Sequence, residues 1–145
     1  MKRIDIFDVE LSNRYKIISK RLGYNPDEYL EDVLNLISIW KSQKYVEIYE
    51  NDLERSYGRL KDSNSTPGST PWYIDLYHAR AVRDENDPLV VLEFKTKEDG
   101  GLPVLIVKFL IHHDEMFGTL KQKKNRQEMQ ALRRRIDAYR KEDNN

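Results

Sequence analysis

The chain has 145 residues, and 25 Lys and Arg are balanced by 25 Asp and Glu, so the formal net charge is zero. This length suits one domain, 1–145. The absence of cysteine excludes disulfides, thiolate metal ligands and a cysteine nucleophile. No run approaches the ~20 apolar residues of a membrane span and the N-terminus lacks the apolar run of a signal peptide, so we expect a cytoplasmic protein without membrane contacts.

The N-terminal part of the chain predicts one strand and a series of helices. Residues 4–11 nearly alternate apolar and polar side chains, with a slip after Phe7, which is typical of an edge strand with a bulge. Residues 13–22 predict a short helix. A longer helix is expected from Asn25, an N-cap residue, with Pro26 in its first turn.

Two apolar patterns at helical spacing follow. The first is the core-facing stripe of the longer helix, formed by Leu30, Val33, Leu34, Ile37 and Trp40. The second predicts a further helix that ends at Gly58, formed by Tyr45, Ile48, Tyr49, Leu53 and Tyr57. The composition of residues 61–71 indicates a surface loop.

The C-terminal part predicts three strands and a final helix. The strands are expected at 72–83, 89–96 and 102–112, separated by a turn at 84–88 and a hairpin loop at 97–101. Asn125 and Glu128 form a capping-box pair at the start of the helix. Its buried stripe comprises Met129, Leu132, Ile136 and Tyr139. Residues 142–145 read as a frayed tail.

These elements predict an α+β fold: an N-terminal strand and helices, a three-stranded antiparallel sheet, and a basic C-terminal helix. The basic character of that helix is hidden in the zero net charge. Residues 117–145 hold nine cationic and four acidic residues, a net charge of +5, and the rest of the chain has −5. A cationic run such as Lys121, Lys123, Lys124 and Arg126 suits phosphate oxygens, although it is also typical of a solvated helix face.

The last predicted strand leads to a candidate catalytic site. Strict alternation places Lys108 and His112 together on its wetter face, and gives His113 to the apolar face. His78 and Arg80 share one face of the first predicted strand, so suitable pairing would add them to the same group. Histidine exchanges protons near neutral pH, and Lys or Arg stabilises the charge that develops in phosphodiester cleavage.

These are the groups needed for metal-independent cleavage of RNA, in which a base activates the ribose 2′-hydroxyl. The candidate catalytic residues are therefore His112, Lys108, Arg80 and His78. The candidate RNA-binding residues are Lys121, Lys123, Lys124 and Arg126, with Tyr139 as a stacking surface. No cofactor is expected, and the three histidines lack the helical spacing typical of a metal site.

The layout resembles the RelE/ParE-like toxins of bacterial toxin–antitoxin systems, and the segments are most similar to the YafO-type mRNA interferases. The similar segments are Ile37–Lys41 running on to Ile48 and Asp52, Trp72 with Ala79 and Arg80, residues 84–88, Leu105–Val107 leading to His112 or His113, and Met129 with Ala138–Arg140. The resemblance implies a RelE-like fold, mRNA cleavage on the ribosome that inhibits translation, and a cognate antitoxin. Its plausible counterparts in this chain are the strand-end histidine and the basic helix.

Two further interpretations stay open. One is a non-catalytic interaction module, such as a small phage- or plasmid-borne inhibitor, that binds a partner through Tyr45, Tyr49 and Tyr57. The other is a DNA-binding regulator, which the lack of helix-turn-helix spacing disfavours. The sequence leaves open whether the chain forms a homodimer.

Overall fold

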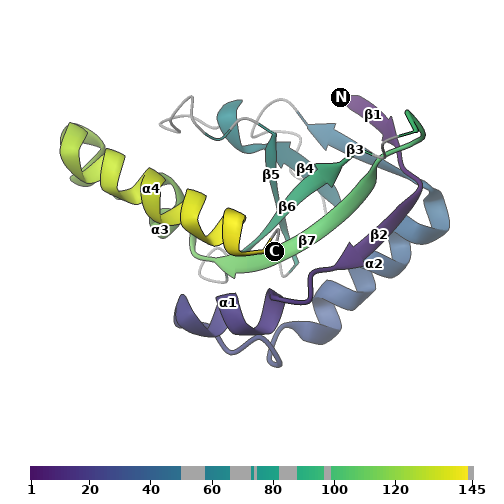
Figure 1. Ribbon diagram of the computed structural model, residues 1–145, viewed down its shortest axis with the longest axis horizontal. Coiled ribbons are helices and arrows are strands. Elements are labelled where there is room, and N and C mark those ends of the chain that lie inside the picture. The colour runs from purple at the N-terminus through teal and green to yellow at the C-terminus, as the bar shows by residue number, and fades with distance from the viewer. Residues whose placement is uncertain (50–57, 66–72, 74, 82–87, 97–98, 144–145) are drawn as a thin grey trace.

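The computed structural model describes residues 1–49, 58–65, 73, 75–81, 88–96 and 99–143 (Figure 1). The strands are β1 (Lys2–Asp5), β2 (Asp8–Leu11), β3 (Tyr45–Tyr49), β4 (Arg59–Asp62), β5 (Leu76–Arg80), β6 (Leu89–Lys95) and β7 (Val104–Ile111). The helices are α1 (Tyr15–Arg21), α2 (Leu30–Gln43), α3 (His113–Phe117) and α4 (Arg126–Asp143), with 3-10 turns η2 (Ser63–Ser65) and η3 (Gln122–Lys124).

The sheet corrects the predicted fold. It is a seven-stranded mixed sheet in the order β1-β3-β4-β5-β6-β7-β2, so the expected three-stranded antiparallel sheet of a RelE-like fold is wrong. The predicted antiparallel set β5–β6–β7 is present, but it forms only the middle of the sheet. The parallel pairs β3–β4 and β2–β7 extend it on both sides.

The N-terminal segment joins the two edges of this sheet. β1 pairs with β3 at one edge and β2 pairs with β7 at the other, although only two residues separate β1 from β2. At the bend, Ile6 N donates to Lys44 O (3.0 Å) and Phe7 N donates to Pro103 O (2.8 Å). The slip predicted after Phe7 is therefore the bend at which the chain passes from one edge strand of the sheet, β1, to the other, β2.

The predicted helix over Tyr45 to Tyr57 is also wrong where the structure describes it, because Tyr45–Tyr49 is strand β3. α2 ends when Lys44 adopts a left-handed conformation (φ 63°). Beyond it, Val46 and Ile48 are buried at a spacing of two, the period of a strand. Tyr57 lies outside the described residues.

Other predicted helix and strand boundaries differ from the observed ones for local reasons. Asn25 does not cap the long helix: its side chain accepts from Asp27 N in a turn (3.1 Å), and α2 begins at Leu30. Leu34 of the predicted stripe is 46 % exposed and Leu36 is buried in its place. Part of the predicted loop, Lys61 and Asp62, pairs with β5 as the end of β4.

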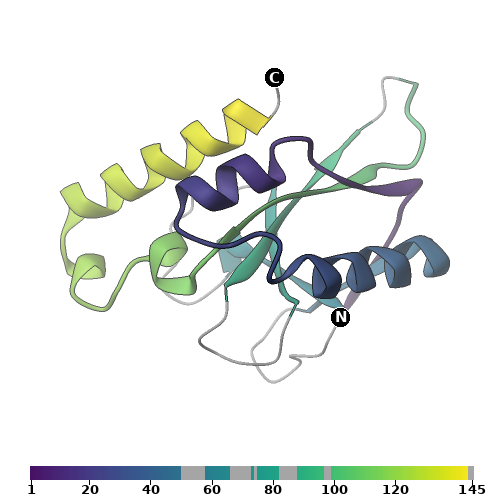
Figure 2. The same ribbon diagram turned by 90° about the horizontal axis from the view of Figure 1, so that it is seen from below.

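Two apolar layers cover the two faces of the sheet. On the inner face, α2 packs through Val33, Leu36, Ile37 and Trp40. On the outer face, helices α1, α3 and α4 contribute Ile18, Leu22, Met116, Phe117 and Ile136. Figure 2 shows α1 and α4 side by side, on the other side of the strands from α2. Within the described residues, no helix is long and apolar enough to cross a membrane.

Candidate nucleic-acid interface

The position of Lys108 is decided by a β-bulge. The register between β6 and β7 shifts between Val91 and Leu92, so that Val91 pairs with Phe109 and Leu92 with Val107. Lys108 is the extra residue, and beyond it the alternation of β7 is inverted. Leu110 therefore joins the inner core and Phe109 the outer one, opposite to the strict alternation expected from the sequence.

Lys108 is buried in an ion-pair network and does not face a wet surface. Its side chain is 1 % exposed, and its Nζ donates to Glu93 Oε2 (2.8 Å). Arg140 of α4 donates to the other oxygen of the same carboxylate (2.9 Å). Burial alone would raise the pKa of Glu93, but the hydrogen bonds from Lys108 and Arg140 outweigh it and hold the pKa below its usual range. This triad joins α4 to the sheet.

The three histidines occupy different environments. His78 is buried, lies 3.0 Å from Ser63 Oγ through its Nδ1, and makes an edge contact with the Phe117 ring (5.2 Å between centroids). His113 packs on the same ring (5.0 Å) and keeps 38 % of its side chain exposed. The Nδ1 of His112 accepts from Asp114 N and so caps α3.

The predicted catalytic group is therefore not assembled as expected. Strand pairing places His78 in line with Val91 and Phe109, two strand spacings from the bulge, and Arg80 in line with Leu89. Phe117 of α3 contacts both His78 and His113, and sequence periodicity gave no sign of these contacts. His112 and Lys108 are instead held in the separate interactions of the α3 cap and the Glu93 network.

The predicted RNA-binding cations gather at the beginning of α4. Asn125 caps this helix as predicted, because its side chain accepts from Gln127 N (3.0 Å) and Glu128 N (3.2 Å). We name the cations around it the basic end surface, and it comprises Lys121, Lys123, Lys124 and Arg126. No ion pair or hydrogen bond of their side chains is found within the described residues, and all but the partly exposed Lys123 are exposed.

The rest of α4 has the opposite character, because three of its five cations, Arg133, Arg135 and Arg140, are paired with carboxylates. The other two, Arg134 and Lys141, have no partner in the described part of the chain. Arg133 and Arg140 lie within ion-pair distance of Asp137 (3.4 and 3.9 Å), and Arg140 also holds Glu93. Glu142 accepts from Arg14 and Arg21 of the α1 region. Tyr139, predicted to stack on bases, packs towards Phe109 (6.1 Å between centroids) and the outer core.

Metal binding receives no support from the described part of the chain, where no three His, Asp or Glu side chains gather in a way that could hold an ion. Comparison with known proteins adds no assignment. No family model, no curated protein and no solved structure matches this chain.

Proposed function

We propose that this protein binds RNA through the basic end surface. The observation that carries the proposal is the uneven pairing of charge along α4. Its C-terminal half is held to the sheet and to α1 by ion pairs, whereas the four cations of the basic end surface face solvent without an acidic partner among the described residues. Unpaired cations of this kind are available to phosphate groups.

We propose RNA as the ligand because the sequence resembles toxins that act on mRNA. Inhibition of translation by mRNA cleavage is the activity that this resemblance implies, and it stays part of the proposal. The structure supports the binding part of the proposal more than the cleavage part, since two of the four predicted catalytic residues, His78 and Lys108, are buried.

A non-catalytic interaction module is the alternative. The surface predicted for it is not the face of a helix, because Tyr45 and Tyr49 lie in β3. Tyr49 is buried, and the Tyr45 ring is covered by the Arg3 guanidinium (3.8 Å). The described tyrosines therefore do not favour this alternative.

RNA binding is tested with a fluorescently labelled single-stranded RNA and the full chain, by anisotropy over a range of salt concentrations. A triple variant with Lys121→Gln, Lys123→Gln and Lys124→Gln is expected to weaken binding and to reduce the slope of log K against log salt by about two, since each phosphate contact on a single strand contributes about 0.7. The matched control removes three exposed cations at the other end of the molecule in Figure 1, with Lys2→Gln, Lys41→Gln and Lys44→Gln.

Each result decides the proposal. Equal loss in both triple variants would show only a response to net charge, and absence of salt-dependent binding by the wild type would reject the proposal. Stronger binding to duplex DNA of the same sequence would favour a DNA-binding regulator. For the catalytic part, induced expression should arrest growth, and His112→Ala should relieve the arrest. Intact mRNA and normal growth with the wild type would reject cleavage without affecting RNA binding.

A further inference from the structure

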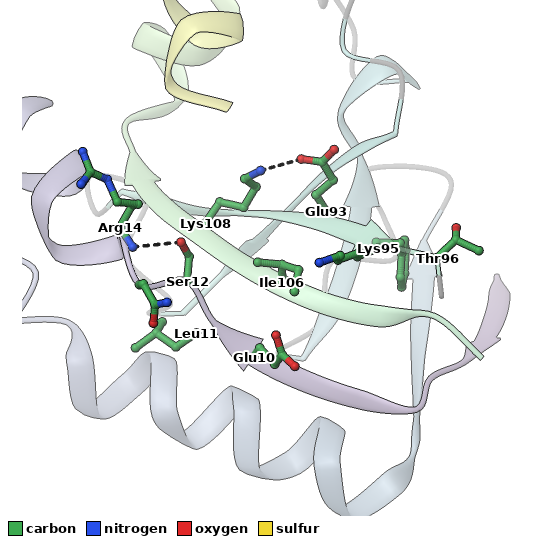
Figure 3. A pocket seen from close by; sticks show the side chains of 11 residues that line it. Glu10, Leu11, Ser12, Arg14, Glu93, Lys95, Thr96, Ile106 and Lys108 are labelled. Carbon is green, nitrogen blue, oxygen red and sulfur yellow. Dashed lines mark hydrogen bonds and ion pairs between the residues drawn. The ribbon is translucent and has the colours of Figure 1, made fainter. Parts of the chain in front are cut away.

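A groove on the outer face of the sheet lies apart from the basic end surface. It has a volume of about 590 Å³ and runs over β7, between β6 on one side and β2 with residues 12–14 on the other (Figure 3). This volume is within the range of small-molecule sites, roughly 300–1,000 Å³. The groove is therefore large enough for a ligand of nucleotide size.

The floor and two walls of the groove are set by strand register. Ile106 of β7 pairs with Glu10 of β2 on one side and with Glu93 of β6 on the other. Lys95 stands two residues beyond Glu93 and so projects from the same face. In Figure 3 the Lys95 side chain extends towards Ile106, and the Glu10 carboxylate rises from β2 on the other side of it.

Glu10 and Lys95 face the same groove without neutralising each other. No ion pair links them, and neither has a hydrogen-bond partner for its side chain in the part of the chain that the structure describes. Their opposite charges are thus available to different groups of one ligand. A cationic side chain suits an oxyanion, and a carboxylate suits hydroxyl or amino donors.

The remaining charges make the end of the groove near α4 positive. Lys108 and Arg140 both bind Glu93, and Arg14 and Arg21 both bind Glu142, so each carboxylate there meets two cations. The Nε of Arg14 is buried and has no hydrogen-bond partner. In Figure 3 the Arg14 guanidinium points away from Ile106 and Lys95, and Glu142 holds it, so Arg14 adds positive charge to this end of the groove without lying in it.

We propose that this groove binds a ribonucleoside monophosphate unit, with its phosphate at Lys95 and its ribose hydroxyls at Glu10. The choice of a nucleotide rests on the proposed RNA function, and the groove would hold the 3′-terminal residue of the bound strand, which keeps both ribose hydroxyls. Two neighbouring hydroxyls can donate to one carboxylate, whereas deoxyribose offers only one of them. Glu10 thereby selects RNA over DNA, and Ile106 provides the apolar surface under the base.

The test is a titration of the full-length protein, followed by the backbone amide NMR signals of Glu10, Lys95 and Ile106. The probes are AMP, its 2′-deoxy analogue and inorganic phosphate. We expect AMP to bind about tenfold more tightly than the deoxy analogue, because one hydrogen bond to a charged group is lost. Glu10→Gln should remove this preference. Lys95→Gln should weaken both nucleotides equally, and Lys44→Gln, an exposed cation outside the groove, should change neither.

Several outcomes would overturn the proposal. In one, AMP leaves the NMR signals of the groove unshifted; in others, AMP binds no more tightly than its deoxy analogue or than inorganic phosphate. A preference for AMP over the deoxy analogue that survives Glu10→Gln would also contradict the proposal. The anisotropy experiment on the basic end surface separates the two proposals. AMP binding without binding of labelled RNA would reject the RNA function and leave the groove as a nucleotide site, and the reverse result would reject the groove alone.

Discussion

The ion-pair network of Glu93, Lys108 and Arg140 predicts different costs for substitutions of its two members in the sheet, Glu93 and Lys108. Glu93→Gln removes the carboxylate from Lys108, whose side chain is 1 % exposed, and from Arg140. Lys108 would keep its longer bond to the Arg140 carbonyl (3.4 Å). In contrast, Lys108→Met leaves the carboxylate paired with Arg140 (2.9 Å) and keeps an unbranched apolar side chain in the same space.

The two substitutions should therefore differ in cost. Breaking a buried ion pair so that a buried charge loses its counter-charge costs about 3–5 kcal/mol. Losing one hydrogen bond to a charge that keeps another partner costs about 1.5–3 kcal/mol. We expect Glu93→Gln to lower the free energy of unfolding by about 4 kcal/mol and Lys108→Met by about 2 kcal/mol. The double variant should cost less than the sum, because the second substitution no longer breaks the same pair.

Urea unfolding at neutral pH measures these differences, with Lys95→Met as the control, since Lys95 is exposed on the same face of β6. The pKa of Glu93 is lowered in the folded protein, so its contribution to stability is complete above the ordinary value of 4.5 and is lost as the pH falls through the lower folded value. The Lys108→Met variant should thus lose stability less steeply on acidification. Additive effects, or a Glu93→Gln variant no less stable than Lys108→Met, would refute this account of the bulge.

Three further substitutions test neighbouring contacts. Ser19→Ala removes the hydroxyl that accepts a hydrogen bond from Leu110 N in β7 (3.0 Å). Urea unfolding should show that the free energy of unfolding falls by about 1–3 kcal/mol. An unchanged free energy would mean that another group accepts this hydrogen bond. Phe117→Ala should cost about 3–5 kcal/mol and shift the imidazole NMR signals of His113, which unchanged signals would contradict. Glu142→Gln should speed amide hydrogen exchange in the last turns of α4, because it weakens the ion pairs with Arg14 and Arg21. An unchanged exchange rate would show that these ion pairs do not hold the end of α4.

The sequence predicted local elements better than their partners. The strands β5, β6 and β7 and the cap at Asn125 were predictable because residue pattern and side-chain chemistry act over a few neighbours. The pairing of β1 with β3 was not, since it joins residues that lie forty or more positions apart in the sequence. The helix predicted over Tyr45–Tyr57 shows the same limit: the tyrosine and isoleucine spacing suits a helix, but pairing of Tyr45–Tyr49 with the distant strands β1 and β4 makes it a strand.

The candidate site depended on one residue of register. Strict alternation along β7 placed Lys108 on the same face as His112. The bulge at Lys108, opposite Val91 and Leu92 of β6, inverts the alternation beyond it and removes that relation. Nothing in a run of apolar side chains marks where an extra residue is accommodated. The charge pattern was more robust, because segregation of cations into residues 117–145 does not depend on strand pairing.

The location of the basic end surface also argues that it serves binding more than folding. A helix has a partial positive charge at its N-terminus, so Lys124 and Arg126 at the start of α4 are placed against the helix dipole. The acidic residue in the first turn, Glu128, offsets this only in part. Cations at the other end of the helix, such as Arg140, both suit the dipole and pair with acidic groups. Phosphate groups next to Lys124 and Arg126 would be attracted by the cations and by the dipole together, so the arrangement that is unfavourable for the isolated helix becomes favourable once an anionic strand is bound.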